Sequence, residues 1–333
     1  MADIAAVPLT PTSPPHGTLA RAERFVWLTA RVLEQRLFAH HFRDGAAGPV
    51  ETALEAYRNA DGGYGHALEP ALRGPASLPA HTARALHVLD SVARCDARRA
   101  EDVCRAEDVC RYLTSVSTTE GALTAIRPEA ALPAVRPAGS GDAAVRLPGA
   151  LSATAPVVGL LHRNEVWHPW LFRATDFCWQ AVESLEAARP GDVAAAVRFL
   201  DHAPDRARAE AAAERLGHLV RRERLAVLDP DAPGARPTAS TATGPTPGHA
   251  LGDRRFPHDY ARTPDSLARA WFTDAETERS LDVLTAGQQA DGGWPARRLP
   301  GAPEPAPAAL LEARPVATIE ALRTLAAYGR SLA

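Results

Sequence analysis

Two short stretches of this sequence bring aromatic side chains together with groups that can transfer protons. The first, residues 162–180, reads HRNEVWHPWLFRATDFCWQ, and the second, residues 63–73, reads GYGHALEPALR. Aromatic faces stabilise cations, and a few convergent polar groups orient a substrate in an apolar pocket. The two stretches therefore predict a pocket for an apolar substrate that reacts by proton transfer.

The candidate residues divide by the role we expect of them. Three can act as acids or bases: His66, Glu69 and Asp176. Seven can contact the substrate: Tyr64, Arg73, Trp167, His168, Trp170, Arg173 and Trp179. A plain helical core with ion pairs at its helix ends uses the same residue types, so this structural interpretation stands beside the functional one. In the later stretch FPHDY, His258 and Asp259 are candidates for an acid or base on a lid, or for an ordinary surface turn.

The elements that position these residues are predicted to be helices. Apolar residues recur at helical spacing through residues 18–42, which predicts one long amphipathic helix. The same spacing recurs in residues 51–59, 80–94, 106–116, 175–188, 192–203, 209–225, 265–272, 278–289 and 316–330. Alternating strand-like runs are almost absent, so the sequence predicts an all-α protein of about ten to twelve helices.

Segments rich in proline, glycine and alanine interrupt this pattern. We expect residues 1–16 to form a flexible N-terminal tail and residues 17–333 to form a single domain. Within that domain, residues 126–151, 228–264 and 294–315 predict long loops, because their proline content opposes a continuous helix.

Composition excludes several classes of function. The chain has 333 residues, a formal net charge of -3 and no lysine, so lysine-based covalent chemistry is excluded and nucleic acid is a poor candidate partner. The N-terminal residues lack a secretion signal, and no apolar run is long enough to span a membrane, so we expect a soluble cytoplasmic protein. The four cysteines are sparse and predict free thiols.

One motif occurs twice at the end of a predicted helix. Residues 59–65 read NADGGYG and residues 288–295 read QQADGGWP. In each copy the aspartate, Asp61 or Asp291, can accept backbone N–H groups, the two glycines permit positive φ, and the aromatic residue covers a helix end. In the second copy, Gln288 and Gln289 can bridge helix ends. The motif therefore predicts a structural turn used repeatedly in a helical protein.

These two turns, with the helices that follow them, resemble the QW-type repeats of the terpenoid cyclase and protein prenyltransferase superfamily. The resemblance covers the two motifs and the helical rhythm of residues 17–332. It implies a single α/α toroid, in which inner and outer helices alternate around a central cavity, with long Pro-rich loops. It also implies a cyclase-like or isomerase-like enzyme that protonates an isoprenoid or another apolar substrate. The DxDD and DDxxD motifs of family cyclases are absent; the nearest text is LDPDAP, with Asp229 and Asp231.

Two alternatives remain open. Asp176-x-Cys178 is similar to the Asp-x-Cys zinc ligands of the protein prenyltransferases, which implies a zinc-dependent transferase with His249 or His258 as the third ligand. The other alternative is a non-catalytic toroid that binds an apolar ligand or a partner protein. Neither substrate nor oligomeric state follows from the sequence, and we expect no resident cofactor apart from this possible zinc ion.

Overall fold

The computed structural model describes residues 17–95, 100–125, 148–186, 188–230, 255–296 and 307–333. These residues form twelve α-helices and one 3-10 helix and contain no β-strand, which confirms the all-α prediction. The α-helices are α1 (Thr18–Thr29), α2 (Val32–Phe42), α3 (Gly48–Glu55), α4 (Pro79–Ser91), α5 (Ala100–Val116), α6 (Leu151–Arg163), α7 (Pro169–Glu183), α8 (Pro190–Leu200), α9 (Arg206–Arg222), α10 (Pro257–Tyr260), α11 (Asp274–Ala286) and α12 (Pro307–Ala327), and the 3-10 helix is η2 (Leu267–Trp271). No helix in this part of the chain is both long enough and apolar enough to span a membrane.

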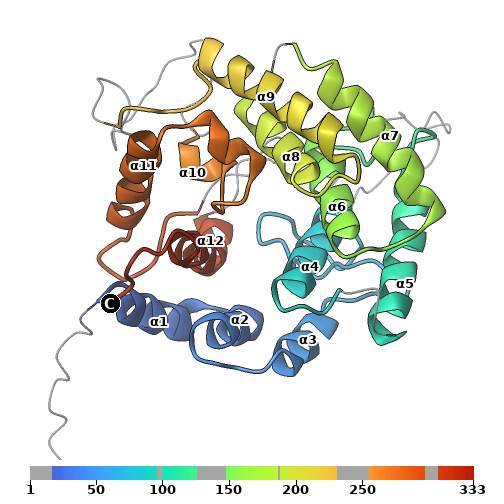
Figure 1. Cartoon of the computed structure of the whole chain (residues 1–333). Coiled ribbons are helices and arrows are strands. Elements are labelled where there is room, and N and C mark those ends of the chain that lie inside the picture. The colour runs from blue at the N-terminus through green and yellow to red at the C-terminus, as the bar shows by residue number, and fades with distance from the viewer. Residues whose placement is uncertain (1–16, 96–99, 126–147, 187, 231–254, 297–306) are drawn as a thin grey trace, which may run out of the picture.

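Contacts connect several of the central helices in chain order and also connect the last helix to the first two. Helices α4, α6, α8 and α10 contact one another in turn, and α12 contacts α11, α1 and α2. In Figure 1, α4, α6, α8, α10 and α12 lie nearer the middle, while α5, α7, α9 and α11 lie toward the periphery. The C-terminal residues reach the start of α1, where the Leu19 N–H donates to the Leu332 carbonyl at 2.9 Å. The two ends of the helical region are therefore held together.

The long helix expected at residues 18–42 is two helices, so that prediction was wrong. The chain breaks at Ala30, whose backbone is extended. Directly after the break, the Arg31 guanidinium donates to the carbonyls of Ala67 at 2.8 Å and Leu68 at 3.1 Å and pairs with Glu34 at 2.6 Å. Contacts with a distant loop thus accompany a break that the local pattern does not predict.

Two further departures concern proline. Helix α12 begins at Pro307, inside a segment expected to be a loop, and continues through Pro315. Proline is compatible with a first helical turn, and in mid-helix it removes one backbone donor without preventing helix on both sides. Helix α6 was absent from the prediction because Pro156 and Gly159 interrupt its sequence. Gly159 is needed there, since a β-carbon on it would lie 2.2 Å from the Arg198 carbonyl oxygen of α8.

The predicted turns have the expected geometry. In the first, the Asn59 N–H donates to the Gly63 carbonyl at 2.9 Å, and Asp61 Oδ1 accepts the Gly63 N–H at 2.9 Å. In the second, the Gln289 N–H donates to the Gly293 carbonyl at 2.8 Å, and Asp291 Oδ1 accepts the Gly293 N–H at 3.0 Å. Gln288 also bridges helix ends as predicted, because its amide donates to the Thr18 carbonyl at 2.9 Å.

A third copy of the turn lies in the middle of the chain, where the sequence motif is not recognisable. In residues 118–123, TTEGAL, the Thr118 N–H donates to the Ala122 carbonyl at 2.9 Å. Gly121 has φ 83°, beside 86° for Gly62 and 96° for Gly292. The three turns therefore share one backbone conformation, although Ala122 and Leu123 replace the second glycine and the aromatic residue.

Each turn is attached to the next central helix through a threonine. In the first turn, the Tyr64 N–H donates to the hydroxyl of Thr82 in α4 at 3.2 Å. In the third copy, the Leu123 N–H donates to Thr154 in α6 at 2.9 Å. In the C-terminal turn, the Trp294 N–H donates to Thr318 in α12 at 3.0 Å. All three threonines are buried. The three helices therefore share a register relative to the turns that precede them.

The third turn provides a stability test. Replacing Thr154 by valine keeps the shape but leaves the buried Leu123 N–H without its acceptor, so we expect unfolding to become easier by about 1–3 kcal/mol. Urea denaturation measures the change. Thr52→Val is the matched control, because Thr52 is exposed and its hydroxyl donates only to the Gly48 carbonyl of its own helix. Equal stability of Thr154→Val and the wild type would contradict a structural role for this hydrogen bond.

Candidate functional site

The candidate residues of the first turn and its following loop do not converge on one point. Tyr64 is fully buried, and burial raises the pKa of its hydroxyl to about 12. His66 is exposed and its Nε2 contacts Asn59 Oδ1 at 3.0 Å. Arg73 is exposed and pairs with Glu312 at 2.8 Å. Glu69 lies further in, and burial raises the pKa of its carboxyl.

The candidate residues of the second stretch are distributed around α7. Trp170 and Trp179 are buried, with Trp170 Nε1 donating to Ser117 Oγ at 2.6 Å and Arg208 lying over the Trp179 ring at 4.3 Å. Trp167 is 75% exposed, and Asp176 and Arg173 are also exposed. His168 Nδ1 accepts the Trp170 N–H at 3.1 Å and so caps α7. Within the described chain, no hydrogen bond, ion pair or ring contact joins this group to the residues at 64–73, so the two stretches do not form one pocket there.

The proposed zinc ligands are also placed apart. Cys178 is fully buried, and burial raises the pKa of its thiol, whereas Asp176 is exposed on the same helix. His258 belongs to α10, where its Nδ1 contacts Ser280 Oγ at 2.6 Å. His249, Asp231 and most of the 228–264 loop lie outside the described residues. Among the residues that are described, no group of three or more His, Cys, Asp or Glu side chains is arranged to hold a metal.

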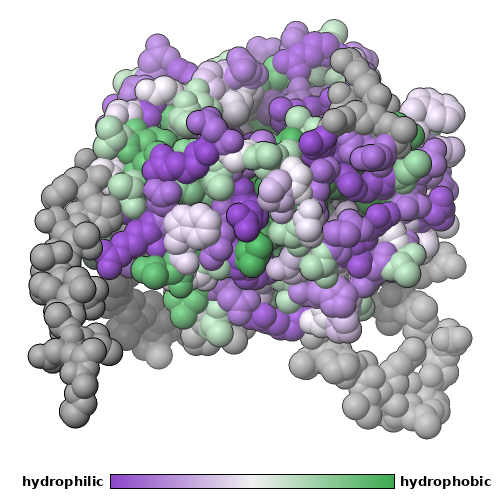
Figure 2. Space-filling model, turned by 90° about the horizontal axis from the view of Figure 1, so that it is seen from below, coloured by the Kyte–Doolittle hydropathy of each residue, from purple (hydrophilic) through white to green (hydrophobic). Residues whose placement is uncertain are grey.

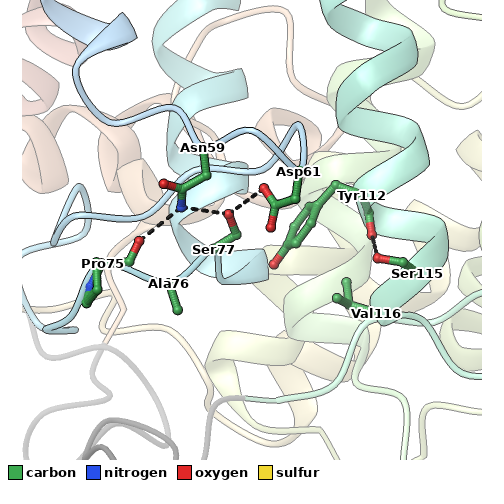
Figure 3. Close-up of a pocket in the computed structure, with 8 residues that line it drawn as sticks. All are labelled: Asn59, Asp61, Pro75, Ala76, Ser77, Tyr112, Ser115 and Val116. Atoms are coloured by element: carbon green, nitrogen blue, oxygen red, sulfur yellow. Dashed lines mark hydrogen bonds between the residues drawn. The ribbon is translucent and has the colours of Figure 1, made fainter.

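An open pocket of about 550 Å³ lies beside the first turn (Figure 3). It is lined by Asn59, Asp61, Pro75, Ala76, Ser77, Tyr112, Ser115 and Val116. Its polar groups are largely occupied: Ser77 Oγ donates to Asp61 Oδ1 at 2.8 Å and accepts from Asn59 Nδ2 at 2.9 Å. These bonds hold the turn in place, so Asp61 has a structural role, as the sequence motif indicates.

A group of charged residues that the sequence did not single out gathers from the central helices. We call it the arginine cluster. It consists of Arg84 and His87 from α4, Arg198 from α8, Arg262 after α10, and Glu320 and Arg323 from α12. Residues more than 200 positions apart thus meet, as the ion pair of Arg84 with Glu320 shows.

Glu320 is the centre of this cluster. Its carboxylate pairs with Arg262 at 2.9 Å and Arg84 at 3.3 Å and lies 3.7 Å from His87 Nε2. Burial by itself raises the pKa of Glu320, but attraction to Arg262, His87 and Arg84 outweighs burial and holds the pKa far below its usual range. Glu320 is therefore ionised, and it ties α4 and α12 to the segment after α10.

The remaining two guanidinium groups have no such partner. Within the described residues, neither Arg198 nor Arg323 makes an ion pair or a side-chain hydrogen bond. Repulsion by Arg262, together with burial, lowers the pKa of Arg198 to about 9, and burial lowers the pKa of Arg323. Arg198 is nevertheless exposed to solvent, and Arg323 is partly exposed. A small solute can therefore reach these unused donors.

Histidines around the cluster are neutral at physiological pH. Burial lowers the pKa of His87 to about 3, Glu320 opposes this shift, and the surrounding arginines add to it. Burial also lowers the pKa of His41 on α2 to about 3, with Arg323 contributing. Since these side chains carry no proton, the positive charge of the cluster resides on the guanidinium groups.

Glu69 is the one predicted acid that belongs near this cluster. Its carboxyl is influenced by Arg84, which lowers its pKa, and by Glu320, which raises it, although burial is the larger effect. Its backbone N–H donates to Nδ1 of the buried His81 at 2.9 Å. His81 therefore fixes the position of Glu69, a role that sequence reasoning missed.

The sequence does contain a signal for four members of the cluster. In HTARALH the residues two and five places after Thr82 are Arg84 and His87, and in ATIEALR the same places after Thr318 hold Glu320 and Arg323. In α6 the residue two places after Thr154 is Pro156, which is uncharged. An alignment of the helices on their threonines therefore identifies Arg84, His87, Glu320 and Arg323 as charged or polar residues at equivalent positions. Arg198 and Arg262 belong to no such repeat.

Comparisons with known proteins support the fold alone. No family model matches this chain, and no curated protein matches it. A solved structure described as a protein from Actinoplanes matches with a TM-score of 0.56 and 17% sequence identity, over 93% of this chain and 98% of that chain. At this identity the likeness shows a shared fold over nearly the whole length, and its description names no activity.

Proposed function

We propose that this protein is a single α/α toroid that binds a small anionic molecule at the arginine cluster. The observation that carries the proposal is the pair Arg198 and Arg323, two guanidinium groups that are at least partly exposed and form no ion pair or side-chain hydrogen bond among the described residues. Glu320 attracts both groups, Asp259 attracts Arg198 and Asp90 attracts Arg323, but none of these carboxylates is in contact with them. Arginine presents a rigid fork of N–H donors that suits oxyanions, so an anion is the ligand these groups fit.

The toroid part of the proposal rests on two features. The helix contacts return from α12 to α1 and α2, and one turn conformation joins successive elements at residues 59–64, 118–123 and 289–294. Both features are expected of the terpenoid cyclase and protein prenyltransferase superfamily, to which we propose a relationship of fold. In such a toroid the arginine cluster lies at the centre, where a ligand is surrounded by the inner helices.

The anionic ligand differs from the wholly apolar substrate that the aromatic stretches suggest. Unpaired guanidinium groups repel a carbocation, because both are positively charged. A plain hydrocarbon would displace water from the guanidinium groups without offering them a hydrogen-bond acceptor, which costs free energy. A substrate with an anionic group and an apolar remainder reconciles the two lines of argument.

Acid catalysis by Glu69 is a second candidate function. Burial raises the pKa of this carboxyl, which favours a protonated acid, and the carboxyl interacts with Arg84 of the cluster. An isomerase-like or cyclase-like reaction would use Glu69 as the proton donor to a substrate that the arginines hold. In that case Glu69→Gln abolishes turnover while anion binding persists, and loss of both together would exclude this role.

The proposal is tested by ligand-induced stabilisation. We expect phosphate, sulfate, pyrophosphate or citrate to raise the melting temperature more than sodium chloride does at equal ionic strength. A ligand at about 100 times its Kd stabilises the folded state by about 2.7 kcal/mol, a shift of several degrees for a chain of this size. Differential scanning fluorimetry and titration calorimetry measure the effect.

Variants identify the site. Arg198→Gln and Arg323→Gln should each weaken the stabilisation at least about tenfold in ligand concentration, as expected for one lost charge-assisted hydrogen bond. Arg222→Gln is the control, because Arg222 is exposed on α9 and pairs only with its neighbour Glu223 at 2.9 Å. If no anion exceeds sodium chloride, or if the control behaves like the two variants, the proposal is wrong.

A further inference from the structure

The first turn and the second turn, residues 289–294, are packed against neighbouring helices in the same way. A β-carbon on the first glycine of each turn, Gly62 or Gly292, would meet a backbone carbonyl oxygen of the adjacent helix, at 2.5 Å for α5 and 2.2 Å for α1. Four residues after that carbonyl, an aromatic ring, Tyr112 or Phe25, covers the second glycine of the turn. The surroundings of the two turns can therefore be compared position by position.

In the second turn, an arginine of the protein itself lies against the aspartate and the ring. Arg314 of α12 donates from both terminal nitrogens to the Asp291 carboxylate, at 2.7 and 2.8 Å. Its guanidinium carbon lies 4.6 Å from the centroid of the Phe25 ring, and its Nε donates to the Trp294 carbonyl at 3.3 Å. An ion pair and a cation–π contact thus hold one guanidinium group beside this turn.

The first turn has no arginine at the corresponding distance from its threonine. Arg314 lies four residues before Thr318, and the residue four places before Thr82 is Leu78. One carboxylate oxygen of Asp61, Oδ1, accepts two hydrogen bonds that hold the turn, whereas Oδ2 has no hydrogen-bond or ion-pair partner within the described residues. The first turn therefore keeps the carboxylate and lacks the guanidinium group.

Two arginines on neighbouring elements are engaged elsewhere. Arg58, just before the turn, and Arg111 of α5 both pair with Asp108, at 2.7 and 2.8 Å. Neither makes an ion pair with Asp61. The charge of the Asp61 carboxylate is therefore available to a cation from outside the described part of the chain.

The open pocket of about 550 Å³ lies at this unfilled place (Figure 3). Asp61 and Tyr112 both line it, just as Asp291 and Phe25 contact Arg314 in the second turn. Among the described residues, the rest of its lining is uncharged. A cation that enters the pocket therefore meets one carboxylate, one aromatic ring and no positive charge there.

The pocket is open to the surface, so a ligand in it is covered on one side only. Pro75 and Ala76 are exposed in its lining and offer apolar contact to the group that carries the cation. An arginine within a polypeptide brings its neighbouring residues to this edge, whereas a free guanidinium ion does not. A partner protein therefore fits the pocket better than a small free cation.

Other exposed groups have no such counterpart within the molecule. Trp27, Leu28 and Val32 are exposed near the junction of α1 and α2, and Trp167 contacts Phe172 on α7. On the face seen in Figure 2, apolar residues form small separate groups among hydrophilic ones. Nothing about these groups indicates what would cover them.

We propose that the pocket beside the first turn binds an arginine side chain of a partner protein, with the guanidinium group between the Asp61 carboxylate and the Tyr112 ring. The carbonyl of Tyr64, which corresponds to the one that Arg314 contacts, already accepts the Leu78 N–H at 3.1 Å. The partner arginine therefore has the carboxylate and the ring only. This site is separate from the arginine cluster, so the two proposals stand or fall independently.

Matched model compounds test the need for a cation. N-acetyl-arginine amide carries a guanidinium group, and N-acetyl-citrulline amide has nearly the same shape without the charge. NMR titration at constant ionic strength follows the amide signal of Gly63, whose N–H donates to Asp61. We expect at least about a fivefold lower Kd for the arginine compound, as one exposed ion pair and one cation–π contact provide. Equal binding of the two compounds overturns the proposal.

Variants identify the site. Asp61→Asn removes the charge but keeps an oxygen that accepts the Gly63 N–H, so it should abolish the preference for arginine over citrulline. Asp291→Asn is the matched control, because Asp291 belongs to the turn that Arg314 already fills, and it should preserve the preference. If Asp61→Asn preserves the preference as well, the arginine compound binds elsewhere and the proposal is wrong.

The comparison between the turns has a test of its own. Arg314→Ala empties the second turn, so N-acetyl-arginine amide should then shift the amide signal of Gly293, which it leaves unchanged in the wild type. Absence of this new response would show that a carboxylate and a ring beside such a turn do not hold a guanidinium group, which contradicts the proposal.

Two further probes distinguish a partner protein from a free compound. Ethylguanidinium and the peptide acetyl-Gly-Arg-Gly-amide carry the same charge, without and with peptide groups. We expect the peptide to bind to the wild type more tightly, because its main chain reaches the edge formed by Pro75 and Ala76. Tighter binding of ethylguanidinium would assign the pocket to a free guanidinium compound and overturn the partner protein.

Discussion

Replacing Gly292 by alanine is expected to destabilise the protein by about 3–5 kcal/mol, enough to unfold a domain of ordinary stability at moderate temperature. Two effects add. Gly292 has φ 96°, a conformation that residues with a β-carbon avoid, and a β-carbon there would lie 2.2 Å from the Arg21 carbonyl oxygen. That oxygen belongs to the backbone of α1, so it cannot move away without displacing the helix.

A matched control separates the two effects. Gly329 also has positive φ, at 70°, but a β-carbon on it would meet nothing within 4 Å. Gly329→Ala should therefore cost only the conformational part, about 1–2 kcal/mol. Urea denaturation of both variants measures the difference, and equal midpoints would show that the turn at 289–294 is not held tightly against α1.

Neutralising Glu320 and neutralising Arg198 are expected to change stability in opposite directions. Glu320→Gln leaves Arg84 and Arg262 without their carboxylate partner, which should destabilise the protein by about 3 kcal/mol. This is the lower end of the range for a broken buried pair, because the Glu320 side chain is 28% exposed. Arg198→Gln removes a charge that Arg262 repels and should raise the melting temperature of the ligand-free protein.

The pH dependence follows from the sign of the Arg198 shift. Its folded-state pKa of about 9 lies below the ordinary value of 12.5, so the unfolded chain binds more protons between these values and stability from this group rises with pH across that window. At neutral pH the group therefore opposes folding. Thermal denaturation of both variants without added anion, and again in phosphate, measures the effect. If Arg198→Gln destabilises the ligand-free protein, Arg198 has a structural partner and the binding site falls with it.

Much of the fold can be predicted from local patterns. The helical spacing identifies most of the helices, and the residues NADGGY and QQADGGW specify turns whose hydrogen bonds close within a few residues. The third turn escaped prediction because its backbone conformation needs only Gly121, while Ala122 and Leu123 hide the motif. Helix α6 escaped prediction because Pro156 and Gly159 oppose helix locally. Gly159 is explained by the close approach of α8, which is a tertiary contact.

The candidate site was harder to predict. The aromatic content of residues 162–180 predicted a substrate pocket there. In the structure, Trp170 and Trp179 are buried around α7, and Trp167 is exposed to solvent. A dense aromatic stretch on one helix is distributed around that helix, so proximity in sequence does not make its side chains converge. Glu69 is the predicted acid that the structure brings near the arginine cluster, with its position set by His81.

By itself, then, the sequence determined the helical class, the recurring turns with their glycines and aspartates, and the absence of lysine chemistry, because each depends on interactions within a few residues or on composition. Only the tertiary structure decided which charges meet. Arg84, Arg198, Arg262 and Glu320 come from four separate elements, and each reads as an ordinary polar position on its own helix. Their joint chemistry arises from like charges held close by the packing of the central helices, and that closeness is a property of the assembled fold.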